Sequence, residues 1–348
     1  MSGPADAPTS VVIDSLEAIA TGAEPLVVDE GSGQLVAALL EQGCSPHVWR
    51  RFAEGAASGE AWPAAVACSS AFVRLGKDRR ALAMALDAAA SVVAPGGTIV
   101  LFGANAEGVK SAGKALDVVA EGVVTVDTRR HSRVLSGTRR GEIAGLRGSL
   151  AAWREVGELT LKGRARPWVS YPGVFAGGGL DPGTAVLLDH LPDVGSRRQG
   201  ATVLDLACGT GIIGAAVRER FPTASVDLVD ADAVAVTAAR ENVAGATIIC
   251  GDGLAAAPRA RYDAILSNPP IHDGVDESLA FLERLIREAP GHIAVGGVLQ
   301  VVIPSRIRAA VAWFEAAFAE TSVVALDRRF QVIRGVKGPA RPTRRDER

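Results

Sequence analysis

Residues 201–214 read ATVLDLACGTGIIG and combine an apolar run with a glycine-rich turn. The first six residues predict a buried strand and the periodicity of 212–220 predicts a helix, so the segment is a strand–loop–helix unit. Its glycines have the Gly-x-Gly-x-x-Gly spacing that lets a backbone approach a nucleotide closely, at Gly209, Gly211 and Gly214. The stretch therefore predicts the first unit of a nucleotide-binding α/β fold.

Apolar strands and helical segments alternate through the rest of the second half. Such alternation is typical of a doubly wound parallel sheet with helices on both faces. The expected strands are 225–230, 246–250, 262–267 and 298–303, and the expected helices are 233–242 and 277–288.

The first half repeats this order more weakly. The corresponding elements are strand 26–29, the turn Gly31-Ser32-Gly33, helix 34–42, helix 80–90, the turn Pro95-Gly96-Gly97 and strand 98–102. Because short glycine turns also follow strands by chance, these residues leave an internal duplication open. Between the halves, residues 159–191 combine aromatic residues with Gly177-Gly178-Gly179, and we interpret them as a covering loop that leads into a second domain.

Composition excludes several classes of protein. The 348 residues are 48% hydrophobic and 22% charged, as in soluble globular chains and unlike disordered or fibrous ones. Lys and Arg number 37 against 39 Asp and Glu, so a net charge of −2 gives no overall basic field for nucleic acid. A nucleic-acid partner would therefore be held by local basic patches.

Two such patches exist. One begins at Arg129 and Arg130 and extends to Arg140, and the other runs from Arg328 to the C-terminus and includes Arg329. Either patch could contact phosphates, and each is equally typical of a solvated loop or tail.

The cysteines and the apolar runs indicate the cellular compartment of the protein. Cys44, Cys68, Cys208 and Cys250 form no Cys-x-x-Cys pair and have no histidine at ligand spacing, which argues against a disulfide framework and a zinc site. Residues 1–10 lack the basic and apolar regions of a signal peptide, and the apolar runs end well before the roughly 20 residues of a membrane span. We expect a cytoplasmic protein without a metal.

Two carboxylates frame the glycine turn. Asp230 ends the second strand 21 residues after Gly209, which suits a ribose-binding acid and keeps a nicotinamide-dependent oxidoreductase open. Asp205 lies in the first strand, where a carboxylate would repel a pyrophosphate. The same carboxylate suits the cationic methionine end of S-adenosylmethionine.

A second motif decides between these cofactors. Asn268-Pro269-Pro270-Ile271-His272-Asp273-Gly274 follows the expected strand 262–267 directly, at the edge of the sheet where ligands bind. Its prolines remove backbone donors and stiffen the loop, which leaves the Asn amide oxygen and a carbonyl as acceptors. Two acceptors are what a planar amino group requires, so the motif favours methyl transfer to nitrogen.

These residues resemble class I S-adenosylmethionine-dependent methyltransferases that act on exocyclic or amide nitrogens. They resemble the ribosomal RNA small subunit methyltransferase C family more closely. The resemblance rests on Pro172-Gly173-Val174-Phe175, Leu180-Asp181-x-Gly183, Asn268-Pro269-Pro270-x-His272-Asp273-Gly274 and Arg329-Phe330-Gln331-Val332-Ile333-Arg334, and in the first half on Gly103-Ala104-Asn105 and Gly108-Val109-Lys110-Ser111-Ala112.

The resemblance implies a fold and a function. Two class I methyltransferase domains stand in tandem, a degenerate one at 1–150 that helps to hold RNA and a catalytic one at 151–348. The activity implied is methylation of a guanine N2 amine in 16S rRNA with S-adenosylmethionine as cofactor. We expect the protein to be a monomer.

The expected site follows. The expected catalytic residues are Asn268, Pro269, Pro270, Ile271 and His272, the last with Asp273 shaping the pocket or relaying a proton. The expected cofactor residues are Asp205, Ala207, Gly209, Gly211, Asp230, Ala231, Asp252, Gly253 and Asn268. The residues expected to bind RNA are Phe175, Arg129, Arg130 and Arg329.

Two positions depart from the family pattern. Ile271 stands where the family has an aromatic residue that can stack on a base, and Ala207 replaces a frequent glycine. Phe175 could supply the missing ring or pack in a core.

Three alternatives remain open. One is a methyltransferase acting on protein glutamine, which has a similar Asn-Pro-Pro motif, usually with Tyr next. The others are a nicotinamide oxidoreductase and a non-catalytic RNA-binding pseudo-methyltransferase.

Overall fold

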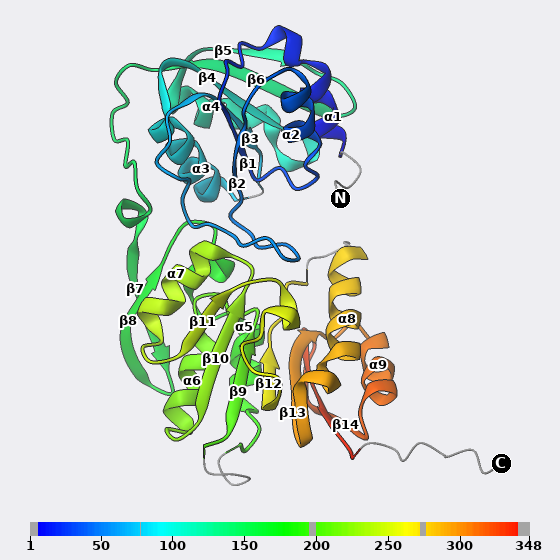
Figure 1. The fold of residues 1–348 in the computed structure, drawn as a ribbon. Coiled ribbons are helices and arrows are strands. Elements are labelled where there is room, and N and C mark those ends of the chain that lie inside the picture. The colour runs from blue at the N-terminus through cyan, green and yellow to red at the C-terminus, as the bar shows by residue number, and fades with distance from the viewer. Residues whose placement is uncertain (1–5, 77, 195–199, 272–275, 340–348) are drawn as a thin grey trace, which may run out of the picture. The chain divides into compact units, whose positions relative to one another are not determined.

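A computed structural model describes residues 6–76, 78–194, 200–271 and 276–339. The chain forms two compact units, each with a central sheet covered by helices (Figure 1). The first unit comprises Met1–Phe52, Gly59–Glu155 and Tyr171–Gly173. The second comprises Ala53–Ser58, Val156–Ser170 and Val174–Arg348. Each sheet is therefore considered on its own.

The first unit has a six-stranded sheet in the order β2-β1-β3-β4-β6-β5. Its strands are β1 (Pro25–Val28), β2 (His47–Trp49), β3 (Cys68–Arg74), β4 (Val93–Ala104), β5 (Ala120–Asp127) and β6 (Ser132–Arg139). Its helices are α1 (Ala7–Asp14), α2 (Gln34–Glu41), α3 (Arg79–Val92) and α4 (Val109–Val119).

The second unit has a seven-stranded sheet in the order β11-β10-β9-β12-β13-β15-β14. Its strands are β9 (Thr202–Leu206), β10 (Ser225–Asp230), β11 (Thr247–Cys250), β12 (Tyr262–Ser267), β13 (Ile293–Pro304), β14 (Glu320–Leu326) and β15 (Phe330–Val336). Its helices are α5 (Pro182–Asp189), α6 (Ile212–Arg220), α7 (Ala233–Asn242), α8 (Asp276–His292) and α9 (Ala309–Ala317).

The two sheets share one topology. The order β2-β1-β3-β4-β6-β5 corresponds strand by strand to β10-β9-β12-β13-β15-β14. In both sheets the first four of these strands are parallel and the last two pair antiparallel. The weak echo in the sequence therefore corresponds to a structural repeat, and the expected tandem α/β fold is confirmed.

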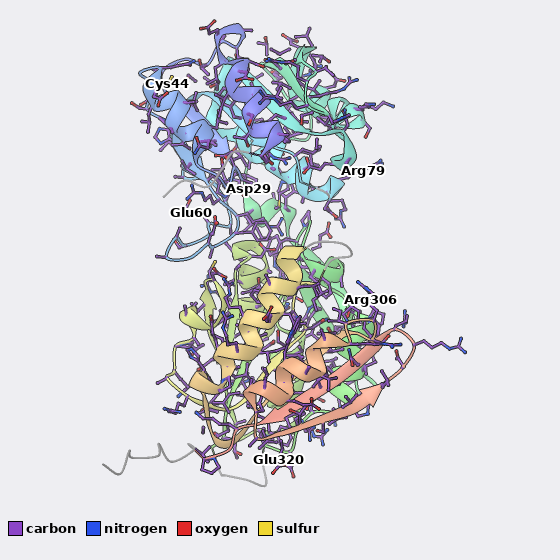
Figure 2. The ribbon with its side chains drawn as sticks, turned by 90° about the vertical axis from the view of Figure 1, so that its right-hand side faces the viewer. Asp29, Cys44, Glu60, Arg79, Arg306 and Glu320 are labelled. Atoms are coloured by element: carbon purple, nitrogen blue, oxygen red, sulfur yellow. The ribbon has the colours of Figure 1, made fainter. Side chains whose placement is uncertain are left out.

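The core of the second unit lies on both faces of its sheet. Val203 packs in the cluster on one face and its neighbour Leu204 in the cluster on the other, and both are fully buried. Successive strand residues point to opposite faces, so a strand buried on both faces reads as a continuous apolar run. Helices α8 and α9 lie side by side and contribute to one of these clusters (Figure 2).

The interpretation of residues 159–191 as a covering loop is wrong. The segment contains most of the hairpin β7 (Glu155–Leu161) and β8 (Arg164–Ser170), a short 3-10 helix at Phe175–Gly178, and α5. Leu161 and Trp168 are buried in the core of the second unit. The glycines that suggested a loop have a local role instead, because Gly177 and Gly178 adopt φ of 60° and 80° within the short 3-10 helix.

No helix among the described residues is long and apolar enough to cross a membrane.

Candidate active site

The carboxyl ends of β9 and β12 lie next to each other and define the site. In the register of these parallel strands Leu206 pairs with Ser267, and the buried Ser267 hydroxyl donates to the Leu206 carbonyl at 2.8 Å. The residues that follow the two strands, Ala207 and Asn268, therefore line the same pocket, which Phe175 also lines. The structure thus brings the glycine turn and the Asn-Pro-Pro motif together.

Asp205 lies fully buried beneath the glycine loop. Its Oδ2 accepts a hydrogen bond of 2.8 Å from the backbone N–H of Gly214, at the start of α6. Its Oδ1 is buried and has no hydrogen-bond partner among the described residues. Burial, reinforced by the charge of Asp230 and opposed by the Gly214 bond, raises the pKa of Asp205 to about 7. The group is therefore poised to lose a proton near neutral pH.

Asp230 shapes the loop from the neighbouring strand. Its Oδ2 accepts from the Gly209 N–H at 2.7 Å, and its Oδ1 accepts from the Asp232 N–H at 2.8 Å. The carboxylate is partly exposed at the end of β10. It is thus placed beside the glycine loop, where a ribose-binding acid is expected.

The backbone of the loop requires its small residues. A Cβ on Gly211, where φ is 90°, would meet a methyl carbon of Val243 at 2.6 Å, so no other residue fits there. Gly209 has φ of 54°, and Ala207 has φ of 55° although it carries a Cβ. Ala207 thus adopts a left-handed conformation that favours glycine, at a position where the family often has one.

The structure places Ala231, Asp252 and Gly253 after the next two strands, with an unexpected neighbour. The Ala231 carbonyl accepts from the Ala53 N–H at 2.8 Å, and Oδ2 of Asp252 accepts from the Gly55 N–H at 3.2 Å. Residues 53–58 come from the first half of the sequence but belong to the second compact unit. No periodicity in the sequence marks this segment as part of the site.

Asn268 is held by two side chains of helix α5. Its Nδ2 donates to Oδ2 of Asp181 at 3.1 Å and to Oγ1 of Thr184 at 2.9 Å. Because a carboxylate only accepts hydrogen bonds, the amide nitrogen and not the oxygen must face Asp181. The orientation of the amide is therefore fixed, with Oδ1 on the side away from Asp181.

The rest of the motif is partly described. Pro269 is buried and Pro270 is exposed. Ile271 is half-buried and packs against the core cluster that contains α8 and α9. His272 and Asp273 lie outside the described residues.

The residues expected to bind RNA are divided between the two units. Phe175 is 56% exposed and lines the pocket with Asn268. Arg329 is exposed at the start of β15, with its guanidinium 5.2 Å from the centre of the Phe330 ring. Arg129 and Arg130 belong to the first unit, in the turn between β5 and β6.

Acidic side chains partly neutralise Arg129 and Arg130. Nε of Arg129 binds both carboxylate oxygens of Asp127, at 3.0 and 2.8 Å. Arg129 and Arg130 both lie near Oδ2 of Asp14, at 3.7 and 3.6 Å. This patch therefore offers less positive charge to phosphates than its sequence suggests.

A groove of about 480 Å³ on the second unit carries more positive charge. Arg164, Arg166 and Arg218 line it together with one acid, Glu219, whose carboxylate oxygens lie 3.9 Å from Arg164 and 4.0 Å from Arg166. Nε and Nη2 of Arg166 are buried and have no hydrogen-bond partner in the described part of the chain. Sequence reasoning missed this groove because its arginines come from β8 and α6.

Sequence reasoning also missed residues that brace the glycine loop. Trp168 Nε1 donates to Oγ1 of Thr210 at 2.9 Å, and Asn242 Nδ2 donates to the Thr210 carbonyl at 3.1 Å. Asp181 did stand out, within Leu180-Asp181-x-Gly183, but nothing in that pattern connects it with Asn268. Their long separation in sequence leaves no local signal.

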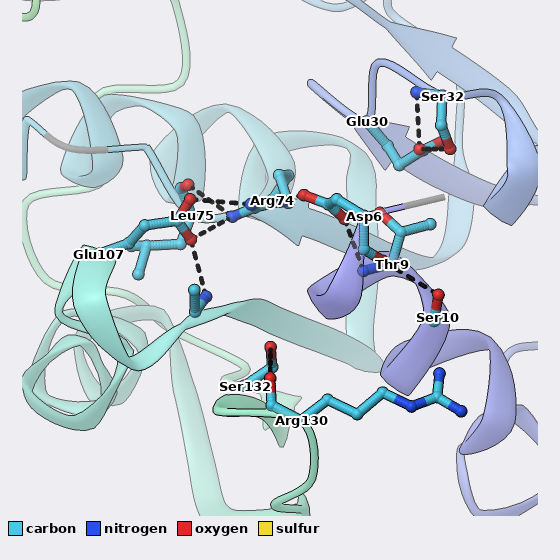
Figure 3. Close-up of polar contacts among 11 residues, drawn as sticks. Asp6, Thr9, Ser10, Glu30, Ser32, Arg74, Leu75, Glu107, Arg130 and Ser132 are labelled. Carbon is cyan, nitrogen blue, oxygen red and sulfur yellow. Dashed lines mark hydrogen bonds and ion pairs between the residues drawn. The ribbon is translucent and has the colours of Figure 1, made fainter. Parts of the chain in front are cut away.

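The corresponding edge of the first unit is filled by its own side chains (Figure 3). The buried Glu30 carboxylate accepts from the backbone N–H groups of Ser32 and Gly33, at 2.8 and 2.9 Å. Arg74 occupies the place of Asn268, because Val28 of β1 pairs with Val73 as Leu206 of β9 pairs with Ser267.

Ion pairs fix Arg74 at that place. Its guanidinium binds both carboxylate oxygens of Glu107, at 2.7 and 2.9 Å, and Oδ2 of Asp6 at 2.8 Å. An ionic network thus occupies the edge of the first sheet where the second sheet has its pocket.

The doubly wound sheet, the glycine loop between Asp205 and Asp230, and Asn-Pro-Pro at the next strand end define a class I methyltransferase. Family models agree: the methyltransferase small domain matches residues 167–334, and the methyltransferase small domain N-terminal matches residues 46–146. The chain belongs to the ribosomal RNA small subunit methyltransferase C family, as the resemblance predicted.

Named relatives and a solved structure extend this finding. Ribosomal RNA small subunit methyltransferase C of Pseudomonas entomophila is 35% identical over 277 residues, which are 78% of this chain and 80% of the relative. That of Pseudomonas paraeruginosa is 36% identical over 246 residues, 70% and 71% of the two chains. The fold matches that of the T. thermophilus 16S rRNA N2 G1207 methyltransferase, solved with AdoMet and guanosine, with a TM-score of 0.80, 22% identity and coverage of 94% and 92%.

Proposed function

We propose that the second unit methylates the exocyclic N2 amine of a guanine in 16S rRNA, with S-adenosylmethionine as the methyl donor. The observation that carries the proposal is the fixed amide of Asn268, whose oxygen is an acceptor next to the glycine loop. The names of the relatives support the same substrate.

The residues of the glycine loop fit S-adenosylmethionine. Asp205 has a buried oxygen without a partner, and the cationic methionine end of the cofactor would stabilise its ionised form. Asp230 would accept hydrogen bonds from ribose hydroxyls, and the backbone of Ala207, Gly209 and Gly211 would allow close approach. Ala231, Asp252 and Gly253 would contact the adenine. S-adenosylmethionine supplies an activated methyl group on a sulfonium.

The chain itself contributes positioning. Oδ1 of Asn268 and the carbonyl of Pro269 would accept the two N–H bonds of the target amine and draw its lone pair out of conjugation with the ring. Correct orientation of reactants supplies much of the acceleration in such a transfer. Pro270 stiffens the loop, and His272 would shape the pocket or relay the released proton with Asp273.

Base and backbone of the RNA would meet different surfaces. The exposed ring of Phe175 would stack on the base, while Ile271 contributes apolar packing. Phosphates would contact Arg129, Arg130 and Arg329, together with the arginine groove of Arg164, Arg166 and Arg218.

The two domains would differ in role. The domain at 151–348 is catalytic, and the domain at 1–150 is a degenerate copy that helps to hold RNA. The Glu30 and Arg74 networks, which fill its sheet edge, support this division.

Transfer of labelled methyl to 16S rRNA made in vitro, followed by nucleoside analysis, tests the proposal. We expect labelled N2-methylguanine in a single turnover with the wild-type protein. Asn268→Ala should lower the rate on the order of a hundredfold or more and leave the cofactor and RNA dissociation constants within a few-fold.

Two outcomes would contradict the proposal. A wild-type protein that binds S-adenosylmethionine and RNA but labels no nucleoside would be a pseudo-methyltransferase. Label on protein would indicate a glutamine methyltransferase.

A further inference from the structure

The start of helix α5 connects directly to Asn268. Asp181 is the N-cap of α5, and its Oδ2 accepts from the backbone N–H of Thr184 at 3.0 Å. The same oxygen accepts from Nδ2 of Asn268 at 3.1 Å. Pro182 at the first helical position has no N–H and a fixed φ, so the cap is rigid. One carboxylate oxygen therefore ties the helix start to Asn268.

Thr184 completes this contact from one turn further along. It is 6% exposed, it lines the pocket, and its hydroxyl oxygen accepts from Nδ2 of Asn268 at 2.9 Å. Both N–H bonds of the Asn268 amide are thus used by α5. A 180° rotation of the amide would turn Oδ1 toward the Asp181 carboxylate and break both bonds, so the structure holds one orientation.

We propose that Asp181 and Thr184 are positioning residues for methyl transfer, which hold the Asn268 oxygen as an acceptor for the target amine. The inference rests on the proposed function and deepens it. Hydrogen bonds in a chain polarise one another, so a bond from the Asn268 amide to a carboxylate makes the amide oxygen a stronger acceptor. Asp181 therefore acts on the amine through Asn268.

Gly183 allows the close packing on which the Asp181 cap depends. A Cβ at this position would lie 3.0 Å from Oδ2 of Asp181 and 3.0 Å from a ring carbon of Phe330. Any larger residue would displace either the cap or the aromatic side chain against which α5 is seated. The sequence Asp181-x-Gly183-Thr184 thus combines a cap, a close approach and an acceptor.

Four variants test the proposal in single-turnover methyl transfer to 16S rRNA. Thr184→Val keeps the shape of the side chain but removes the acceptor, and Thr184→Ser restores it. Asp181→Asn keeps an oxygen for the cap but removes the charge. Asp78→Asn is the matched control, because Asp78 caps α3 in the same way, accepting from the Ala81 N–H at 2.7 Å, and belongs to the first unit.

We expect the rate to fall about 10-fold for Thr184→Val and about 10- to 50-fold for Asp181→Asn, as for removal of one neutral and one charge-assisted hydrogen bond. Thr184→Ser should stay within about threefold of wild type, and Asp78→Asn should not change the rate. Dissociation constants for S-adenosylmethionine and RNA should stay within about twofold in all four variants, since the effect is on the transition state.

A double variant separates positioning from a structural role. Because Thr184 acts through Asn268, Thr184→Val should lower the rate no further in an Asn268→Ala background. Melting temperatures of all variants report folding, and Asp181→Asn and Asp78→Asn should lose similar stability.

Three results would overturn the proposal. They are wild-type rates in both Thr184→Val and Asp181→Asn, a parallel weakening of cofactor binding, and an additive decrease in the double variant. If Asn268→Ala is slow while these variants are not, only the positioning role fails. If the wild-type protein labels no guanine, the proposed function fails and the positioning role falls with it.

Discussion

The backbone N–H of Gly214 donates a hydrogen bond of 2.8 Å to Oδ2 of Asp205, beneath the glycine loop. That bond satisfies Oδ2 of the carboxylate, whereas Oδ1 is buried without a hydrogen-bond partner among the described residues. A negative charge at this place is therefore costly in the absence of a cation, and burial raises the pKa of Asp205 to about 7.

Stability should depend on pH through Asp205. Between about pH 4 and pH 7 the folded state holds a proton at this group that the unfolded state has released, so the free energy of unfolding falls as pH rises through this range. Asp205→Asn removes the titration. Between pH 5 and pH 8, without cofactor, the wild type should lose about 2 kcal/mol more than the variant. Chemical denaturation across pH measures this difference, and equal slopes for the two proteins would contradict it.

Asp230→Ala should weaken cofactor binding. Hydrogen bonds to charged groups contribute about 1.5–3 kcal/mol each, so the dissociation constant for S-adenosylmethionine should rise roughly 10- to a few-hundred-fold. Asp263→Ala is the control, because Asp263 accepts from Thr202 at the opposite end of β9. Titration calorimetry on both variants checks this, and an unchanged constant for Asp230→Ala would mean that the ribose is held elsewhere.

Phe175 should matter more for RNA than for cofactor. Stacking of a base on an aromatic ring contributes about 1–3 kcal/mol, so Phe175→Leu should raise KM for an rRNA fragment roughly 5- to 100-fold, and Phe175→Trp should not. Steady-state kinetics with each variant provide the test, and equal KM values for the Leu and Trp variants would exclude stacking.

Ile271→Phe should keep or raise activity, since it restores a ring at the position after Asn-Pro-Pro. The same kinetics measure its activity.

The two arginine surfaces should contribute differently to RNA binding. Replacement of Arg164 and Arg166 by Ala should reduce the slope of log K against log salt by up to about two, one for each phosphate that is no longer neutralised. Replacement of Arg129 and Arg130 should reduce it by less, because Asp14 and Asp127 already pair with them. Binding to rRNA fragments across a salt series measures the slopes.

Cofactor affinity should stay constant in both arginine variants. Arg287→Ala, an exposed position on α8, serves as control. If no variant changes the slope of log K against log salt, neither arginine surface contacts RNA phosphates and both are solvated surface.

The central strands could be predicted from the sequence because both their faces are buried. The expected strands 225–230 and 262–267 coincide with β10 and β12. The hairpin β7 and β8 escaped prediction because its strands carry exposed polar residues and its turn a glycine. The antiparallel strand β14 escaped for a related reason, since it is largely exposed.

The candidate site shows the same division. Asp205, Gly209 and Asn268 stand out because each lies at or just after the end of an apolar run that predicts a strand. Asp181 and Thr184 lie 87 and 84 residues from Asn268, and only the folded chain brings them together. Arg74 likewise reads as an ordinary strand residue until its ion pairs with Glu107 and Asp6 are seen.

The internal Glu30 and Arg74 networks have a consequence for how the protein responds to metabolism. A ligand that binds only the folded state stabilises it in proportion to the logarithm of its concentration. The free energy of unfolding of the second unit should therefore depend on the concentration of S-adenosylmethionine and fall when that concentration falls. The first unit carries its own acid and its own cation at the same sheet edge, so we expect its stability to be independent of the S-adenosylmethionine concentration.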